Sequence, residues 1–414
     1  MTRTVLASQA DIVIAGGGYA GLTLALALAQ ALGSTRSIVL IDRGVPRDTA
    51  ASDPRASAIS AAAKRLFEVL GVWPRLAGEA QPVSAIQLTD SSLNAGVRPV
   101  LLTISNTIPG DDPASYIVPN AVLGPALLAA VEAMPAVTVW PRAAATGFDA
   151  DERGVTVRLA EGCSIRAVLL VGADGRSSPL RDAAGIQIVG WNYPQVGIVT
   201  TVAHERPHGG KAVQHFLPGG PFAILPLKGN RSSITWSEDA ERAREILALD
   251  DQGFLAEVDK RFGGRLGALR LDGPRNSWPL EMHLARRYVA CRFALLGDAA
   301  HGVHPLAGQG LNLAIRDAAA LTEVVVDAVR LGLDLGDSAV LERYEQWRRF
   351  DSALSAATFD GLNRLFSNDW ALLRSAREFG LGLVDRLPIL KQLFVQEAAG
   401  LSGELPRLLR GEPV

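Results

Sequence analysis

Residues 297–321, GDAAHGVHPLAGQGLNLAIRDAAAL, bring together side chains whose types and spacing could do chemistry. Two histidines and two aspartates within one short segment could form an acid–base site. The spacing His301-x-x-His304 could begin a metal site. Four glycines beside an apolar, helix-like run could instead hold a large anion on free backbone amides.

Two of these three alternatives lack the further residues that they need. His301 and His304 would supply two metal ligands, but the stretch offers no convincing third ligand, and Pro305 indicates a turn rather than a ligating helix. The chain also contains no Gly-x-Ser-x-Gly elbow of the kind that presents a hydrolytic serine. We therefore expect no metal site, and we expect the histidines to support the loop.

The elements around this stretch favour the anion cradle. An apolar strand is predicted over 292–296, and Asp298 follows at its carboxyl end, where open α/β sheets bind ligands. From about residue 310 the apolar positions follow helical spacing. The glycines of the intervening loop leave amides unobstructed at the helix N-terminus, an arrangement that suits a delocalised anion such as a reduced flavin.

A second glycine motif stands near the N-terminus, in DIVIAGGGYAGLTLALALAQALG. A short strand, the spacing Gly16-x-Gly18-x-x-Gly21 and a following helix are typical of a dinucleotide pyrophosphate site. The next predicted strand, 37–41, runs into Asp42, 21 residues after Gly21, where a carboxylate can accept hydrogen bonds from an adenosine ribose. That acid disfavours the 2′-phosphate of NADP here, while NAD and FAD both remain open at this point.

The bulk composition excludes some classes of partner. A formal net charge of −2 and a pI near 6.3 provide no basic field for nucleic acid or an anionic membrane. Cys163 and Cys291 lie far apart without metal-ligand spacing, so a reducing compartment, and hence the cytoplasm, is expected. The uncharged run 12–29 contains the glycine turn and follows Asp11, which argues against a signal peptide or a membrane span.

The order of predicted elements indicates an α/β fold with an interrupted nucleotide domain. Strands are expected at 85–89, 100–104, 137–140, 155–159 and 167–171. A helix is expected over 61–70, and short strands separated by Gly/Pro turns over 196–236 favour a mostly antiparallel sheet. We expect a discontinuous Rossmann-like domain over 1–80, 115–190 and 285–350. A substrate-binding domain is expected over 81–114 and 191–284, and a C-terminal helical region over 351–414.

Three ordered motifs then carry a resemblance to a known family. They are the glycine motif from Gly16, the Asp174-Gly175 pair in VGADGRSSPLR, and GDAAHGVHPLAGQGLN. Together they resemble the group A FAD-dependent aromatic monooxygenases, whose fold is that of p-hydroxybenzoate hydroxylase. Within that family the chain looks most like the UbiH-type hydroxylases of ubiquinone biosynthesis, and DPRASAIS at 53–60 supports this.

The resemblance implies roles at matching positions. It places the pyrophosphate at the first glycine motif, the adenosine ribose at Asp42 and the isoalloxazine at 308–312. Asp174 is implied in binding both FAD and NAD(P)H, although it could equally serve to end its strand. The implied FAD-binding residues are Gly16, Gly18, Gly21, Asp42, Arg43, Arg55, Asp174, Asp298, Gly308, Gln309, Gly310, Leu311 and Asn312. Pro305 is implied to line the flavin face where oxygen reacts.

Two residues depart from the family pattern. Ala314 stands where many relatives have glycine, and Asn120 stands where several have a flavin-contacting arginine. The second departure puts in doubt any flavin contact from the helix that carries Asn120.

The implied activity is ring hydroxylation. NAD(P)H reduces FAD, and oxygen then forms a C4a-hydroperoxide that hydroxylates a polyprenylated phenol. The chain has no second Gly-x-Gly-x-x-Gly, which agrees with transient docking of NAD(P)H. The segment 216–226 is an expected pocket lining. Residues 379–394 form an expected surface for lipid, at the periphery of the inner membrane, or for other quinone-biosynthesis proteins.

Other functions stay open at this point. The chain could hydroxylate a different aromatic substrate, reduce isoprenoid double bonds with the same cofactor, or bind flavin as a non-catalytic partner in a quinone-synthesis complex. A flavin halogenase is disfavoured because none of the seven tryptophans forms a Trp-x-Trp motif.

Overall fold

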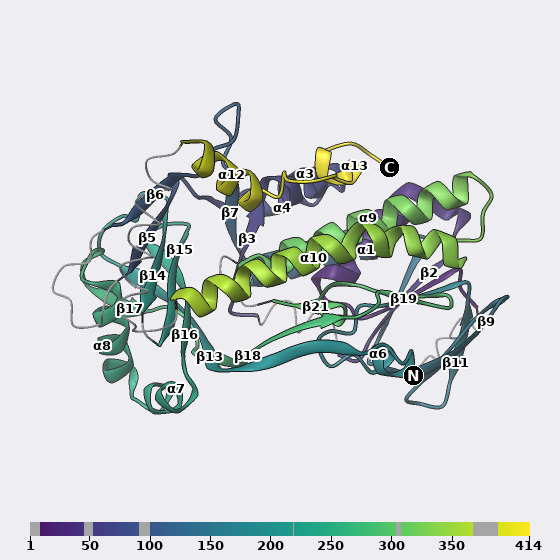
Figure 1. Ribbon diagram of the computed structural model, residues 1–414, viewed down its shortest axis with the longest axis horizontal. Coiled ribbons are helices and arrows are strands. Elements are labelled where there is room, and N and C mark those ends of the chain that lie inside the picture. Colours follow the sequence, from purple (N-terminus) through teal and green to yellow (C-terminus); the bar gives the residue numbers. More distant parts are fainter. Residues whose placement is uncertain (1–8, 45–52, 91–99, 218, 304–307, 367–387) are drawn as a thin grey trace.

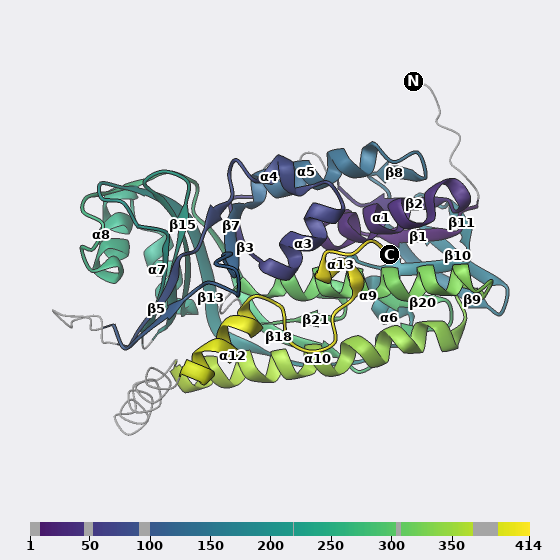
Figure 2. The same cartoon turned by 90° about the horizontal axis from the view of Figure 1, so that it is seen from above.

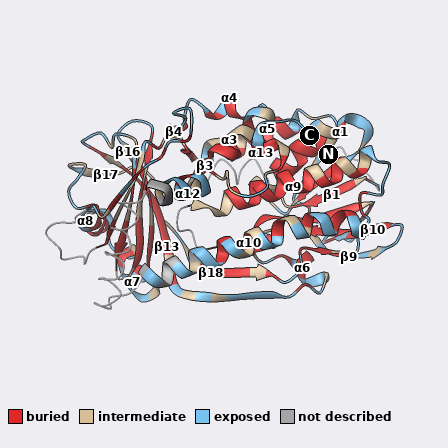
Figure 3. Ribbon diagram, turned by 45° about the horizontal axis from the view of Figure 1, so that its top comes forward, coloured by how far each residue is buried: buried red, intermediate tan, exposed pale blue. Residues whose placement is uncertain are grey.

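The computed structural model describes residues 9–44, 53–90, 100–217, 219–303, 308–366 and 388–414. The molecule is elongated, with a parallel sheet and its helices at one end and a large antiparallel sheet at the other (Figures 1 and 2). Buried residues concentrate in the strands of both sheets and on the inner sides of the helices (Figure 3).

The parallel sheet has the strand order β19-β20-β12-β1-β2-β8. Only β19 runs antiparallel to its neighbour. Its strands are β1 (Ile12–Ala15), β2 (Ile38–Asp42), β8 (Val137–Pro141), β12 (Leu169–Gly172), β19 (Val289–Ala290) and β20 (Phe293–Leu295). Every residue of β1, β12 and β20 is buried, as their uninterrupted apolar sequences predict for strands covered on both faces.

Long helices and a small antiparallel sheet enclose this parallel sheet. The helix α1 (Tyr19–Leu32) packs against both α5 (Asn120–Glu132) and α9 (Gly310–Arg330). The small sheet consists of β9 (Ala145–Asp151), β10 (Gly154–Leu159) and β11 (Ser164–Ala167), and the Phe148 ring of β9 lies 4.8 Å from the Phe293 ring of β20. These elements share one hydrophobic core with the parallel sheet.

The single strand predicted over 167–171 is wrong in one respect. The chain changes sheets at Val168, so that β11 ends at Ala167 and β12 begins at Leu169. The Val168 and Leu169 amides both donate to the Asp11 carbonyl oxygen, at 3.0 and 3.1 Å. Because Ala167 and Leu169 are both buried, the apolar run does not reveal where one strand stops and the next begins.

The large sheet has the order β21-β18-β13-β16-β15-β14-β5-β6, with β17 also paired to β13. Its pairs are antiparallel except for β14 with β5. The strands are β5 (Ala85–Asp90), β6 (Leu102–Ser105), β13 (Ile188–His204), β14 (Lys211–Leu217), β15 (Gly220–Leu227), β16 (Arg231–Asp239), β17 (Leu269–Leu271), β18 (Asn276–Ala285) and β21 (His301–Gly302).

Two helices cover one face of this sheet and leave the other face for a cavity. Phe222 and Trp236 of the sheet pack with Phe254 and Phe262 of α8 (Asp251–Phe262), beside α7 (Ala240–Leu247). The opposite face of the same strands looks toward a small sheet of β3 (Ala56–Ser60), β7 (Ser115–Pro119) and β4 (Gln81–Pro82).

The remaining helices pack around these sheets. They are α3 (Ala61–Val69), α4 (Trp73–Leu76), α6 (Pro179–Ala183), α10 (Ser338–Phe366), α12 (Pro388–Ala398) and α13 (Arg407–Arg410). The helix α10 lies along α9, whereas α13 packs against α3 and α9. None of the helices in the described ranges is long and apolar enough to cross a membrane.

The strands β13 and β18 join the two ends of the molecule. They pair along most of their lengths, with a register shift between Asn192 and Val196. At the end nearer the parallel sheet, β21 pairs with β18, although residues 301–302 belong to the segment 285–350 expected in the nucleotide domain. The two ends of the molecule are therefore connected by hydrogen-bonded strands.

Candidate flavin and substrate site

The glycine turn after β1 has two packing glycines and one that faces open space. A Cβ atom on Gly16, whose φ is +121°, would lie 2.0 Å from the Ala173 carbonyl oxygen, and one on Gly21 would lie 1.9 Å from the Gly16 oxygen. A Cβ on Gly18, the N-cap residue of α1, would have no neighbour within 4 Å. The turn is thus closely packed against the protein, yet open where a pyrophosphate would approach the helix amides.

Asp42 lies beside this turn, as predicted. Its two carboxylate oxygens accept hydrogen bonds from the Gly17 amide at 2.5 Å and the Gly44 amide at 2.7 Å. A carboxylate can accept about four hydrogen bonds, so these two contacts orient Asp42 and leave acceptor capacity for ribose hydroxyls. The neighbouring Arg43 is exposed.

Asp298 lies in a short 3-10 turn, Gly297–Ala299, that follows β20. Its side chain is exposed, while its backbone carbonyl accepts a hydrogen bond of 2.9 Å from Nε2 of the buried His283. Burial lowers the pKa of His283, which favours the neutral ring. Asp298 therefore has a fixed backbone and a side chain that is free to meet a ligand.

The glycine loop at the start of α9 provides the second helix N-terminus of the site. Gly308 adopts a φ of +63°, and the side chain of the N-cap residue Gln309 does not cap the helix. The amides of Gly310 and Leu311 in the first turn can therefore point at an anionic ring. Asn312 behaves differently, because its side chain accepts from the Ser60 amide at 3.0 Å and donates to the Ala58 carbonyl at 2.8 Å.

The structure thus gives the Asn312 side chain a role in joining α9 to β3. Pro305 and His304 lie outside the described residues.

Arg55 lies at the centre of a polar cluster that sequence reasoning missed. Its guanidinium forms an ion pair with Asp53, 2.6 Å from Nη2 to Oδ2, and lies 5.3 Å from the Trp278 ring centre. Asp53 Oδ2 also accepts from the Tyr19 hydroxyl at 2.8 Å and from Asn120 Nδ2 at 2.9 Å. Burial opposes ionisation of Asp53, but the Arg55 and Asn120 hydrogen bonds prevail and lower its pKa to about 2.

This cluster explains the departure noted at Asn120. Its amide donates to the Asp53 carboxylate, which in turn binds Arg55, so α5 helps to position Arg55. The only sequence signal was the Asp-x-Arg spacing at 53–55, in which the Asp53 carboxylate accepts from the Arg55 amide at 3.0 Å.

Asp174 lies where β12 ends and α6 begins. Its Oδ2 accepts from the Leu180 amide at 3.3 Å, and its Oδ1 is buried without a partner among the described residues. Burial raises the pKa of this carboxyl. These contacts support a role in joining β12 to α6, which the sequence left open beside a cofactor role.

His301 belongs to a chain of buried charges behind the cradle. Its Nε2 lies 2.6 Å from Oδ2 of Asp317, which is fully buried and also accepts from the Gly297 amide at 3.1 Å. Arg348 Nε lies 2.7 Å from the other oxygen of Asp317, and its Nη1 lies 2.5 Å from Oδ2 of Asp351. His301 therefore joins β21 to α9 through Asp317. In the described ranges no cluster of three or more His, Cys, Asp or Glu could hold a metal ion.

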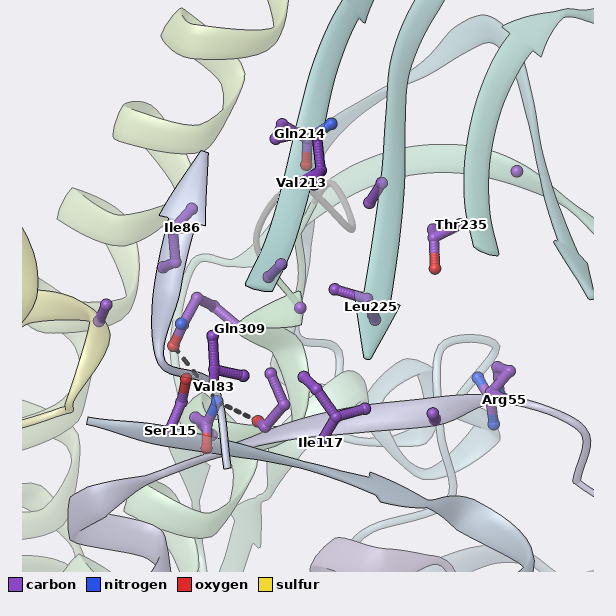
Figure 4. A pocket seen from close by; sticks show the side chains of 18 of the residues that line it. Arg55, Val83, Ile86, Ser115, Ile117, Val213, Gln214, Leu225, Thr235 and Gln309 are labelled. Atoms are coloured by element: carbon purple, nitrogen blue, oxygen red, sulfur yellow. Dashed lines mark hydrogen bonds between the residues drawn. The ribbon is translucent and has the colours of Figure 1, made fainter. Parts of the chain in front are cut away.

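A cavity of about 450 Å³ begins at Arg55 and the glycine loop and extends over the open face of the large sheet. At this first end it is lined by Arg55, Ala58, Gly308 and Gln309, whereas strands β5, β6 and β13–β16 supply mostly apolar side chains (Figure 4). Phe394 of α12 also lines it and is half exposed, so this helix lies at a mouth of the cavity.

Comparison with known proteins identifies the family of this chain. The family model described as FAD binding domain matches residues 9–353. The chain is 46% identical to "Ubiquinone hydroxylase UbiL" of Rhodospirillum rubrum, over 98% of this chain and 94% of that protein. It is 35% identical to "3-demethoxyubiquinol 3-hydroxylase" of Escherichia coli, over 94% of this chain and 98% of that protein.

A solved structure supports the fold. It is p-nitrophenol 4-monooxygenase PnpA of Pseudomonas putida, which superimposes with a TM-score of 0.78 at 19% identity, covering 96% of this chain and 99% of that one.

The expected fold, the family resemblance, the bound FAD and the cosubstrates NAD(P)H and O2 are confirmed by these matches. The chain belongs to the FAD-binding domain family, and within it to the FAD-dependent monooxygenases that include the hydroxylases of ubiquinone biosynthesis.

Proposed function

We propose that this protein hydroxylates the aromatic ring of a polyprenylated phenol in ubiquinone biosynthesis. The observation that carries the proposal is the continuous cavity between the cofactor residues and the mouth at α12. A ring near the cradle and a prenyl chain directed toward α12 could occupy it together. The two ubiquinone-pathway relatives support the same class of substrate.

We assign the FAD contacts to the residues that the family resemblance implied. The open face of Gly18 and the first turn of α1 would bind the pyrophosphate, Asp42 the ribose, and the exposed Asp298 the chain between them. Arg55 would lie near the flavin, and the amides of 310–311 would stabilise negative charge on its ring. When bound, FAD supplies the redox chemistry by which NAD(P)H and O2 deliver one oxygen atom to the substrate.

The cavity walls support the apolar part of the substrate. Ile86 and Leu88 of β5 pair with Ile104 and Leu102 of the neighbouring strand β6, and all four side chains line the cavity. Such walls exclude water from the reacting groups and would accept an isoprenoid chain. We also propose that the chain is divided as the sequence predicts, into a cofactor-binding region, a substrate-binding region and a C-terminal helical region.

The mouth supports a peripheral contact with the inner membrane from the cytoplasmic side. Leu393 and Phe394 are adjacent on α12, and their exposed fractions are 56% and 50%. An exposed apolar pair beside a cavity opening gives a prenyl chain a route from a bilayer. Other quinone-biosynthesis proteins would bind at the same region. Of the surface expected over 379–394, residues 379–387 lie outside the described residues.

The function is tested with the FAD-loaded full-length protein, NADPH or NADH, and a phenol bearing a short prenyl chain. We expect substrate-stimulated NAD(P)H oxidation and a hydroxylated product that contains oxygen from isotopically labelled O2. Reduction of the prenyl double bonds without oxygen insertion would indicate an isoprenoid reductase. A FAD-loaded protein that neither oxidises NAD(P)H nor alters the phenol would contradict catalysis and favour the non-catalytic partner.

Membrane contact is tested separately by co-sedimentation with vesicles of neutral and anionic phospholipid. We expect Leu393→Asp to reduce the bound fraction with hydroxylation of a short-chain phenol retained. Leu333→Asp, a similarly exposed leucine beyond α9, serves as the matched control. Equal binding by the two variants would contradict a contact through α12.

A further inference from the structure

Five residues from five strands form one row across the open face of the large sheet. The strand register pairs Gln214 of β14 with Leu88 of β5 and with Ala223 of β15. Ala223 pairs with Thr235 of β16, which pairs in turn with Val199 of β13. All five residues line the cavity.

The middle of this row alternates polar, small and polar side chains. Gln214 and Thr235 lie two strands apart, so their backbones are separated by about 10 Å. Ala223 lies between them and contributes a single methyl group. Figure 4 shows Gln214 and Thr235 on the cavity side of their strands. The row therefore leaves a shallow gap of about the width of a substituted ring, with a hydrogen-bonding group on each side.

The Gln214 amide has unused hydrogen-bonding capacity. Its Nε2 atom is buried and has no hydrogen-bond partner among the described residues. Other polar groups of the lining are occupied: Ser115 Oγ accepts from Asn106 at 2.9 Å, and Asn312 is held by β3. A buried donor without a partner is unfavourable, so a ligand oxygen at this position would be stabilised.

The charges around the cavity favour a ring without a carboxylate. Among the described lining residues the cations are Arg55 and Arg176. Arg55 is paired with Asp53, and Arg176 Nε lies 2.9 Å from Oε1 of Glu281. A benzoate would therefore have to compete with an existing carboxylate for a cation, whereas neutral oxygens need only the amide and the hydroxyl.

We propose that Gln214 and Thr235 recognise two oxygen substituents of a neutral aromatic ring that lies over Ala223. Gln214 and Thr235 can each donate and accept, so they suit a phenol hydroxyl, a methoxy group or a quinone oxygen. This assignment rests on the proposed function, to which it adds the residues that select the ring.

The test compares two probes on the FAD-loaded full-length protein by isothermal titration calorimetry. One probe is a methoxyphenol carrying a single prenyl group, and the other is the prenylbenzene that lacks the ring oxygens. We expect Gln214→Leu and Thr235→Val each to raise the Kd of the phenol about tenfold, as loss of one hydrogen bond implies. The Kd of the prenylbenzene should stay within about twofold, since the apolar contacts remain.

Two further variants keep the test informative if one replacement disturbs folding. Thr235→Ser retains the hydroxyl and should bind the phenol as the unchanged protein does, whereas Ala223→Leu fills the gap and should weaken both probes. Gln87→Leu is the matched control: it makes the same replacement on β5, next to β14, where Gln87 binds Arg265 outside this cavity. Its affinities for both probes should be unchanged.

The outcomes separate this assignment from the proposed function. If the unchanged protein binds and hydroxylates the phenol, but Gln214→Leu affects both probes equally or neither, the function stands and the assignment is wrong. If it binds neither probe, both are wrong. Tighter binding of a carboxylated analogue than of the neutral phenol would also overturn recognition of a neutral ring.

Discussion

Replacing Gly18 by alanine should separate cofactor binding from folding. Gly18 has φ −74° and ψ −179°, an extended conformation that alanine adopts without strain, and its Cβ would meet no atom within 4 Å. The apoprotein should therefore fold normally, because the lower entropy of the unfolded chain, about 0.4–1 kcal/mol, offsets the weaker preference of alanine for the N-cap position of α1. The added methyl group would occupy the face at which a pyrophosphate must approach the helix amides.

The expected loss of affinity follows from the contact that the methyl group blocks. A hydrogen bond from an amide to a charged phosphate is worth about 1.5–3 kcal/mol, so the Kd for FAD should rise roughly 10- to 100-fold. The assay is titration of apoprotein with FAD, followed by quenching of flavin fluorescence. Thermal unfolding of the same apoprotein, followed by circular dichroism, reports the fold.

Gly78→Ala provides the control, because a Cβ at Gly78 also meets nothing within 4 Å and the residue follows α4, outside the glycine turn. It should leave the FAD affinity unchanged. The reasoning is refuted if Gly18→Ala binds FAD as tightly as the unchanged protein, or if its apoprotein is strongly destabilised.

Three more replacements test the polar groups of the site. Asp317→Ala leaves Arg348 without its buried acceptor and should lower the free energy of unfolding in urea by about 3–5 kcal/mol; a loss below about 1 kcal/mol would contradict the buried ion pair. The folded-state pKa of Asp53, about 2, lies below its ordinary value of 3.8, so its carboxylate stabilises the apoprotein above pH 4 and this contribution is lost as the pH falls toward 2. Asp53→Asn should therefore lose about 2 kcal/mol at pH 7 and show a smaller further loss between pH 4 and 2 than the unchanged protein, in urea unfolding at each pH. Asp298→Ala should fold but purify with less FAD, because its side chain is exposed to a ligand, and full FAD content by absorbance would argue against that contact.

The parts of the site that depend on local backbone geometry could be predicted from the sequence. The spacing of Gly16, Gly18 and Gly21 determines a turn whose packing involves only its neighbouring elements, and Asp42 is positioned by the strand that it ends. The expected α/β fold, with its inserted antiparallel sheet, followed from similar local patterns and is confirmed by the family and the structural match.

The missed residues depend on contacts across long stretches of chain. Asp53 meets Tyr19 and Asn120, which are 34 and 67 residues away. The position of Gln214 in the cavity follows only from the register of β14 with β15. A polar residue within an alternating strand otherwise indicates a side chain that faces solvent. Neither spacing nor periodicity contains that pairing information.

The order of strands in the parallel sheet also means that some apolar surfaces are synthesised long before the elements that cover them. The helix α1 is made early, but its packing partner α9 begins at Gly310, and β12 lacks its neighbour β20 until residue 295 has emerged. At ribosomal rates of about 5–20 residues per second, the apolar surface of α1 waits roughly 15–60 s for that partner. A nascent chain with this topology is a natural client for chaperones, and slowing translation between residues 32 and 310 should increase its aggregation.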